Sequence, residues 1–192
     1  YASFARIGKG SLGGKGRGLA FMSAMVRRYP KLSREGFEVN IPKTVVLCTD
    51  IFDEFMEENG LYPLALSDAG DEEILAAFEH GKLPERVRDD LISLLKVVKG
   101  PIAVRSSSLL EDSHYQPFAG IYATYMIPHS EDQDVTLDLL RGAIKAVYAS
   151  VFYKASKSYL TATQNVIDQE KMAVVLQEVA GTKHGTRYYP TL

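Results

Sequence analysis

The stretch from Pro101 to Tyr125 constrains the fold of this chain more than any other. It opens with a short apolar run, Ile102–Val104, continues through Arg105 and a polar segment, and returns to apolar and aromatic residues near Tyr122. This order predicts a strand, a polar loop and a second strand. The first, buried strand would deliver Arg105 to its own end, directly before a loop of small residues.

The end of that strand has the residue types that bind phosphate. A guanidinium pairs well with phosphate oxygens, and a loop containing Ser106–Ser108 would leave backbone N–H groups free to point at an anion. An ordinary hairpin, in which Arg105 pairs with Glu111 or Asp112, is the alternative. The serines match no nucleophile-elbow pattern, so we expect them to make loop hydrogen bonds rather than to act in covalent catalysis.

A second stretch that suits phosphate lies near the start of the chain. The segment Gly8–Gly18 is rich in glycine and carries Lys9, Lys15 and Arg17. Glycine permits positive φ angles and a close approach of the backbone to a ligand. Leu19–Val26 predicts a helix, so the segment would be a cationic loop before a helix start. It does not match the Walker pattern, and a flexible solvated loop is the alternative.

The rest of the chain alternates between strand and helix patterns. Thr49 or Asp50 is expected to cap the helix predicted over residues 51–58. We expect a loop over residues 61–70. Buried strands are predicted over residues 44–47 and 171–180, and helices over 51–58, 71–79, 84–98, 135–152 and 155–165.

Composition excludes several classes of protein. The chain has 192 residues, 46% of them apolar, with a formal net charge of −2, which argues against nucleic acid as a partner. Cys48 is the only cysteine, lies in an apolar run, and cannot form an intrachain disulfide. No stretch of the sequence reaches the length of a membrane span, and no signal peptide is evident. We therefore expect a cytoplasmic protein with no membrane partner.

Metal binding is not indicated by the histidines. His80, His114, His129 and His184 are scattered along the chain, and no pair has the spacing of metal ligands. We interpret them as surface residues and predict no metal site in this chain. The tail after Gly181 ends on a strand-prone segment, so we expect the chain to be a piece of a longer protein.

Three spaced motifs together resemble one family. Residues 13–20, GGKGRGLA, resemble the start of the nucleotide-binding domain of phosphoenolpyruvate synthase and pyruvate phosphate dikinase. Residues 103–107, AVRSS, with the acidic pair at 111–112 and FAG at 118–120, resemble its second signature. Residues 172–179, MAVVLQEV, resemble its third. The resemblance covers nearly the whole of residues 1–192 and implies an α+β (α/β) fold of the ATP-grasp type, with mixed sheets packed by helices and a possible lobe boundary near residue 100.

The resemblance also implies a division of roles around ATP. Lys15 and Arg105 would hold the phosphates and have the catalytic, charge-stabilising role. The adenine would lie in an apolar slot with backbone hydrogen bonds. Backbone amides of Phe118, Ala119 and Gly120 would cover the phosphates with Thr124 close by, and Gln177, Glu178 and Val179 would line the adenine edge.

Further partners follow from the same resemblance. The family's Mg²⁺ ligands, its phosphohistidine domain and its acceptor-binding domain would lie downstream of this chain, so the chain alone is expected to be inactive. The intact enzyme would pass a phosphoryl group from ATP to a histidine and then to an acceptor such as pyruvate. The sequence departs from the family at Gly18, where members often carry Asn, and at Ile121, where they often carry Gln. A nucleotide-sensing or regulatory module, and an interaction domain with a decayed site, are the rival interpretations.

Overall fold

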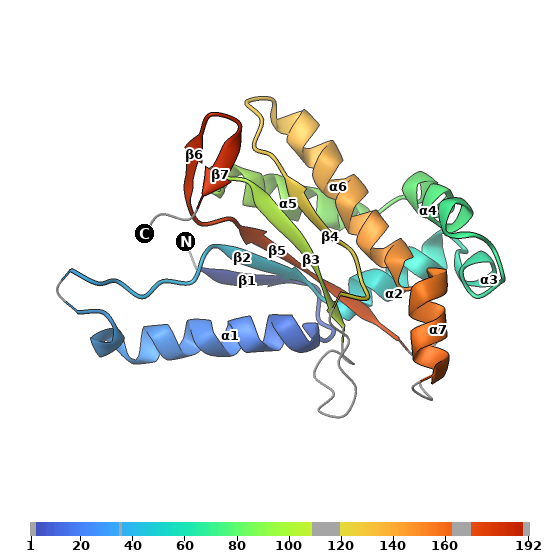
Figure 1. The fold of residues 1–192 in the computed structure, drawn as a ribbon, viewed down its shortest axis with the longest axis horizontal. Helices are drawn as coiled ribbons and strands as arrows, with labels where there is room; N and C mark the ends of the chain where they lie inside the picture. Colours follow the sequence, from blue (N-terminus) through green and yellow to red (C-terminus); the bar gives the residue numbers. More distant parts are fainter. Residues whose placement is uncertain (1–2, 35, 109–119, 163–169, 190–192) are drawn as a thin grey trace.

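The computed structural model describes residues 3–34, 36–108, 120–162 and 170–189 (Figure 1). The strands are β1 (Phe4–Ile7), β2 (Thr44–Leu47), β3 (Ile102–Ser108), β4 (Thr124–Ile127), β5 (Met172–Glu178), β6 (Thr182–His184) and β7 (Arg187–Tyr189). The helices are α1 (Gly13–Arg28), α2 (Thr49–Glu58), α3 (Tyr62–Ala65), α4 (Asp71–His80), α5 (Glu85–Val97), α6 (Gln133–Ser150) and α7 (Lys154–Ala162), with a 3-10 turn, η1, at Pro30–Leu32.

Five strands form one mixed sheet in the order β1-β2-β5-β3-β4. β1 is parallel to β2, and the other neighbouring strands are antiparallel. β6 and β7 form a separate two-stranded hairpin beside it (Figure 1). The mixed sheet packed with helices confirms the predicted α/β fold class. A lobe boundary near residue 100 stays a prediction, and strands from both sides of that residue share this one sheet.

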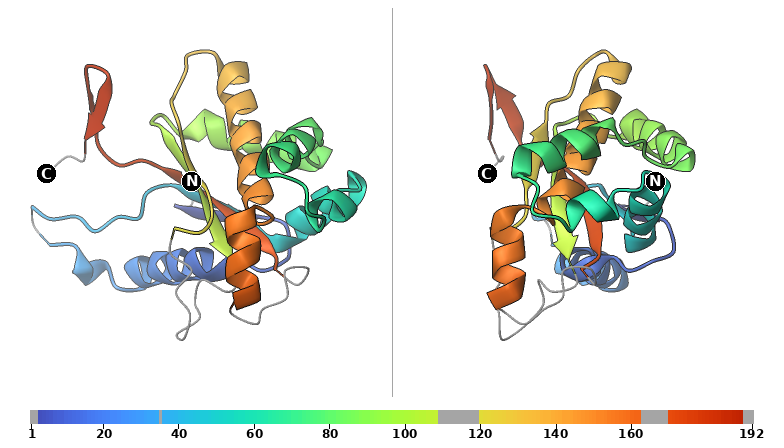
Figure 2. Two further views of the ribbon diagram at one scale, coloured as in Figure 1. Left: turned by 45° about the vertical axis from the view of Figure 1, so that its right-hand side comes forward. Right: turned by 90° about the vertical axis from the view of Figure 1, so that its right-hand side faces the viewer.

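The two faces of the sheet are covered differently. One face carries the main core, in which side chains of β2, β3 and β5 pack against α2, α4, α5 and α6. The other carries a small cluster of Val46, Ala173 and Val175, against which Leu12 and Leu19 pack from the start of α1. Figure 1 and the turned views of Figure 2 show α1 lying apart from the main group of helices. We call the second face the α1 face of the sheet.

Local sequence patterns account for most of these elements. The predicted stripe of α5, Leu91, Leu94, Leu95 and Val98, is buried in the main core, as its helical spacing requires. Cys48 is fully buried, and burial raises the pKa of its thiol. The predicted loop over residues 61–70 contains the short helix α3, and β1 was not predicted. None of the described helices has the combined length and apolarity that crossing a membrane would require.

The prediction that the three serines after Arg105 form a loop was wrong. Ser106, Ser107 and Ser108 belong to β3, where they pair with Val174, Ala173 and Met172 of β5. All three serines are buried. Their backbone groups lie in the ladder of a central strand because β5 supplies partners that the local sequence does not reveal. The loop that follows, with Glu111 and Asp112, falls outside the described residues.

The start of the first helix was also predicted incorrectly. α1 begins at Gly13 rather than Leu19, so the second half of the glycine-rich segment is helical. Glycine is a poor helix former, and here its lack of a side chain permits close packing on the sheet. At α2, the predicted cap was wrong as well. Cys48 is the N-cap residue without a side-chain bond, and Thr49 and Asp50 bind another segment of the chain.

Candidate functional site

Lys15 and Arg105, which are far apart in the sequence, lie at neighbouring places in the fold. Lys15 is in the first turn of α1, and its ammonium Nζ donates to the carbonyl oxygen of Ser106 at 3.0 Å. Ser106 directly follows Arg105 in β3. Both cationic side chains are half-buried. The fold therefore brings the two predicted phosphate-binding cations to the same strand.

The register of the sheet places more of the predicted residues on the α1 face. Residues directly opposite each other in an antiparallel pair point to the same face. Arg105 is opposite Val175 of β5 and Thr124 of β4, and Val175 belongs to the cluster under α1. Gln177 is two residues further along β5, and its amide Nε2 donates to Thr44 Oγ1 at 3.1 Å. Arg105, Thr124 and Gln177 thus share the face on which α1 and Lys15 lie.

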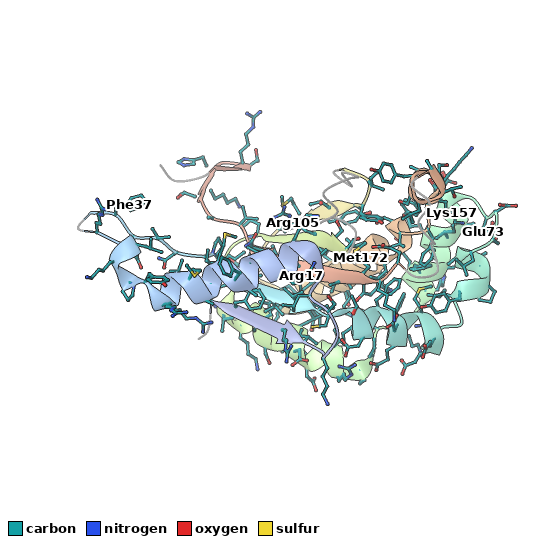
Figure 3. All side chains as sticks on the ribbon, turned by 90° about the horizontal axis from the view of Figure 1, so that it is seen from below. Arg17, Phe37, Glu73, Arg105, Lys157 and Met172 are labelled. Carbon is teal, nitrogen blue, oxygen red and sulfur yellow. The ribbon has the colours of Figure 1, made fainter. Side chains whose placement is uncertain are left out.

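Several cationic side chains lie on this face of the described structure. Arg105 makes no side-chain hydrogen bond or ion pair with the part of the chain that the structure describes. The first turn of α1 contains no acidic residue, so the positive end of the helix dipole is not neutralised there. Figure 3, which views the molecule from the α1 side, shows Arg17 on α1 and Arg105 on the strand beside it. This arrangement favours an anionic ligand.

The amides at the start of the glycine-rich segment bind the protein's own carboxylate. The N–H groups of Lys9 and Gly10 donate to the two carboxylate oxygens of Asp50, each at 2.9 Å. The N–H of Ser11 donates to Thr49 Oγ1 at 2.9 Å. Burial by itself would raise the pKa of Asp50. Hydrogen bonds from the backbone N–H groups of Lys9, Gly10 and Asp50, together with the positive charge of Arg86, outweigh burial and hold the pKa below its ordinary value. Asp50 therefore fixes this part of the segment to the start of α2.

The later glycines allow α1 to approach β3 closely. Gly13 has φ of +66°, and a Cβ atom there would lie 1.8 Å from the carbonyl oxygen of Ser107. Ser107 Oγ accepts a hydrogen bond from the N–H of Gly16 at 3.0 Å and donates to the carbonyl oxygen of Leu12 at 2.8 Å. The glycine-rich segment thus packs between the start of α2 and β3 and is hydrogen-bonded to both.

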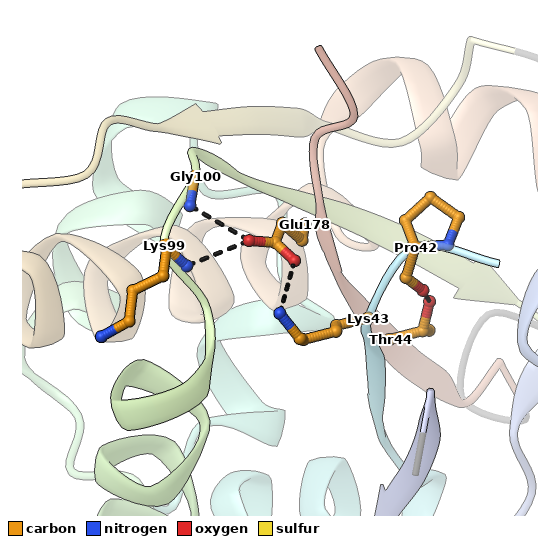
Figure 4. Close-up of polar contacts among 6 residues, drawn as sticks. All are labelled: Pro42, Lys43, Thr44, Lys99, Gly100 and Glu178. Carbon is orange, nitrogen blue, oxygen red and sulfur yellow. Dashed lines mark hydrogen bonds and ion pairs between the residues drawn. The ribbon is translucent and has the colours of Figure 1, made fainter. Parts of the chain in front are cut away.

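The predicted adenine-edge residues stand at the end of β5. The carboxylate of Glu178 accepts from the N–H groups of Lys99 and Gly100 and forms an ion pair with Lys43 Nζ at 3.2 Å (Figure 4). Burial would raise the pKa of Glu178, but these contacts outweigh it and lower the pKa. The backbone N–H of Glu178 donates to the carbonyl oxygen of Lys43, and that of Val179 donates to Pro101. The side chain of Glu178 therefore ties β5 to the turn before β3.

The predicted phosphate-covering loop is described only at its end. Phe118 and Ala119 lie outside the described residues. Gly120 is exposed and has φ of +75°, which a residue with a side chain rarely adopts. Thr124, at the start of β4, is also exposed. The roles assigned to these residues stay predictions.

Several hollows of the described surface lie away from these side chains. The largest of four, about 1070 Å³, is bounded by residues 67–72 and by α7. Another, about 530 Å³, lies between Pro101, Pro128 and the β6–β7 hairpin. None of the four is lined by Lys15 or Arg105. We recognise the candidate site by its side chains and by the register of the sheet.

Two residues that organise the site were not singled out from the sequence. Asp50 was interpreted as a helix cap, because a carboxylate before an apolar helix usually is one. Ser107 was placed in a loop. A signal for Ser107 was present, since it lies two residues after Arg105 and would share its face if the strand continued. No pattern around Asp50 indicates that its partners lie about 40 residues earlier.

Comparison with known proteins identifies the family of this chain. Residues 9–186 match the family described as pyruvate phosphate dikinase, AMP/ATP-binding domain. A relative from Bacillus subtilis (strain 168), the uncharacterized phosphotransferase YvkC, is 29% identical over 150 residues. That alignment covers 77% of this chain and 16% of the relative, so the chain spans only a small part of that protein's length. Because the family match covers almost the whole chain, the protein belongs to the pyruvate phosphate dikinase AMP/ATP-binding domain family.

Proposed function

We propose that the chain is the ATP-binding portion of a phosphotransferase that passes a phosphoryl group from ATP to a histidine on a separate domain. A nitrogen of that histidine would attack phosphorus, the bond from phosphorus to the bridging oxygen would break, and the leaving oxygen would depart with the nucleotide. The acceptor, for example pyruvate, would then take the phosphoryl group through an oxygen and release the histidine.

One observation carries the proposal. Lys15 on α1 reaches the carbonyl oxygen of Ser106, the residue after Arg105, so an ammonium and a guanidinium come to the middle of β3 from two elements. A polyphosphate gathers several negative charges, and phosphoryl transfer depends on positioning and on neutralising that charge. In this proposal Lys15 and Arg105 bind the phosphates and stabilise the charge that builds up during transfer.

Thr124 and the end of β5 complete the proposed ligand contacts. Thr124 is opposite Arg105 in the sheet and presents an exposed hydroxyl on the same face. Gln177, on the same face, would lie toward the base, with Glu178 and Val179 beside it. Phe118, Ala119 and Gly120 would contribute backbone amides over the phosphates. In this proposal the ligand lies along the α1 face from β4 to β5, in an ATP-grasp arrangement.

The residues that the structure describes do not form a magnesium site. Among the described residues, no three His, Cys, Asp or Glu side chains are grouped so that they would hold a metal ion. Lys15 Nζ donates to the carbonyl oxygen and to the hydroxyl of Ser106. No role proposed here for Lys15 or Arg105 runs through a metal, and Mg²⁺ ligands are expected from other parts of the intact protein.

The experiment is to incubate the intact protein with radiolabelled ATP and to test for an acid-labile, base-stable phosphohistidine. We expect label on the protein in the wild type and its loss when Lys15 is replaced by methionine. A non-catalytic nucleotide-sensing module is the second candidate, favoured by the departures at Gly18 and Ile121. ATP binding without any phosphohistidine would support sensing and contradict the transfer. Absence of any nucleotide binding would support an interaction domain instead.

A further inference from the structure

We propose that Ser107 is a positioning residue of the nucleotide site, which holds Lys15 against β3 beside Arg105. This inference rests on the proposed function, because it assigns Ser107 a role that acts through a predicted phosphate-binding residue. Ser107 itself is fully buried and would not touch the ligand.

The hydroxyl of Ser107 holds the first turn of α1 at two points. It donates to the carbonyl oxygen of Leu12 at 2.8 Å and accepts from the N–H of Gly16 at 3.0 Å. These two residues stand on either side of Lys15 in the chain. The backbone that carries Lys15 is therefore fixed to β3 three residues before Lys15 and one residue after it.

The packing around these bonds permits little adjustment. A Cβ atom on Gly13 would overlap the backbone of Ser107, and a Cβ atom on Gly16 would lie 3.0 Å from Leu12 Cβ and 3.3 Å from Val46 Cγ1. Protein interiors packed this closely do not shift freely. The position of the first turn of α1 against β3 is thus set by contacts on several sides.

The same strand carries both the anchor and the second cation. Ser107 lies two residues after Arg105 in β3, so the two side chains share the α1 face. Ser106, between them, accepts from the ammonium of Lys15. One short strand segment therefore fixes the spacing between the ammonium and the guanidinium before any ligand arrives. Such preorganisation improves binding because less order has to be created in the complex.

The test is a double-mutant cycle in the intact protein, with ATP binding measured by calorimetry for the wild type, Ser107→Ala, Lys15→Met and the double variant. We expect Ser107→Ala to weaken ATP binding roughly ten-fold, the size typical of losing about one net hydrogen bond's contribution at the site. If Ser107 acts through Lys15, the two losses will not add, and Ser107→Ala will change little when Lys15 is already absent.

Ser156→Ala is the matched control. Ser156 is also a fully buried serine whose hydroxyl donates to a backbone carbonyl, that of Ser150, but it lies on α7 within the main core. We expect Ser156→Ala to lower the melting temperature by an amount similar to that for Ser107→Ala and to leave ATP affinity unchanged. If Ser107→Ala does not fold, Ser107→Cys keeps a weak donor and acceptor of similar shape and enters the same cycle with the same expected non-additivity.

Two results would overturn the inference alone: wild-type ATP affinity in Ser107→Ala while Lys15→Met binds weakly, or losses that add fully in the double variant. Wild-type affinity in Lys15→Met, or no ATP binding by the wild type, would overturn the proposed function, and the role of Ser107 with it. The Lys15→Met measurement therefore distinguishes the two failures.

Discussion

Arg105→Ala removes a guanidinium that makes no side-chain hydrogen bond or ion pair with the described residues. The Arg105 side chain is half-buried, and among the described residues it has no hydrogen-bond or ion-pair partner. Its strand is held by backbone pairing with β4 and β5, which alanine preserves. We therefore expect the unfolding free energy to change by less than about 1 kcal/mol, as for substitutions that break no buried bond.

The expected effect on ATP binding is much larger. A charge-assisted hydrogen bond to an ionised group contributes about 1.5–3 kcal/mol. Since about 1.4 kcal/mol corresponds to a ten-fold change in affinity, Arg105→Ala should weaken ATP binding by about 10- to 100-fold. Adenosine, which lacks the phosphates, should bind the variant and the wild type alike. The contrast between the two ligands reports the phosphate contact specifically.

The assay is calorimetric titration of the intact protein with ATP and with adenosine, accompanied by urea unfolding. Arg88→Ala is the matched control, because Arg88 is exposed on α5, in the helix layer opposite the α1 face, and has no side-chain partner within the described residues. Arg88→Ala should leave both affinities unchanged. Equal ATP affinity in Arg105→Ala and in the wild type would refute the assignment of Arg105 to the phosphates. An equal loss for adenosine would place its effect elsewhere in the site.

Two further predictions concern the glycine-rich segment. The pKa of Asp50 is lower in the folded state than in the unfolded state, so its contribution to stability is present above the unfolded pKa and is lost as the pH falls through the folded pKa. Asp50→Asn should therefore make the unfolding free energy depend less steeply on pH in the acid range. An unchanged dependence on pH in that range would contradict this prediction. Gly13→Ala should destabilise the protein by about 2–4 kcal/mol in urea unfolding, from positive φ and overpacking against Ser107. The control Gly18→Ala, where a Cβ has no neighbour within 4 Å, should be neutral or stabilising; equal effects of the two would show that packing against Ser107 is not the cause.

Local patterns in the sequence were sufficient to predict the helices and strands that form the main core. The spacing of Leu91, Leu94 and Leu95 gives one buried helical stripe wherever the helix packs, and the apolar runs of β2 and β5 are buried on both faces. The three family motifs also indicated Lys15 and Arg105 as candidate phosphate-binding residues. Such features depend on neighbours a few residues away, so the chain's own order contains them.

Only the tertiary structure decided which backbone groups those motifs would use. Ser106–Ser108 are strand because β5, more than 60 residues later, supplies their ladder partners. The backbone N–H groups of Lys9 and Gly10, early in the glycine-rich segment, bind the carboxylate of Asp50. The later glycines of the segment permit α1 to pack closely against β3. These outcomes depend on which distant segment supplies the hydrogen-bond partner of each buried donor and acceptor. A partner that is far away in the sequence produces no periodic pattern around the residue that it binds, so the local sequence cannot reveal it.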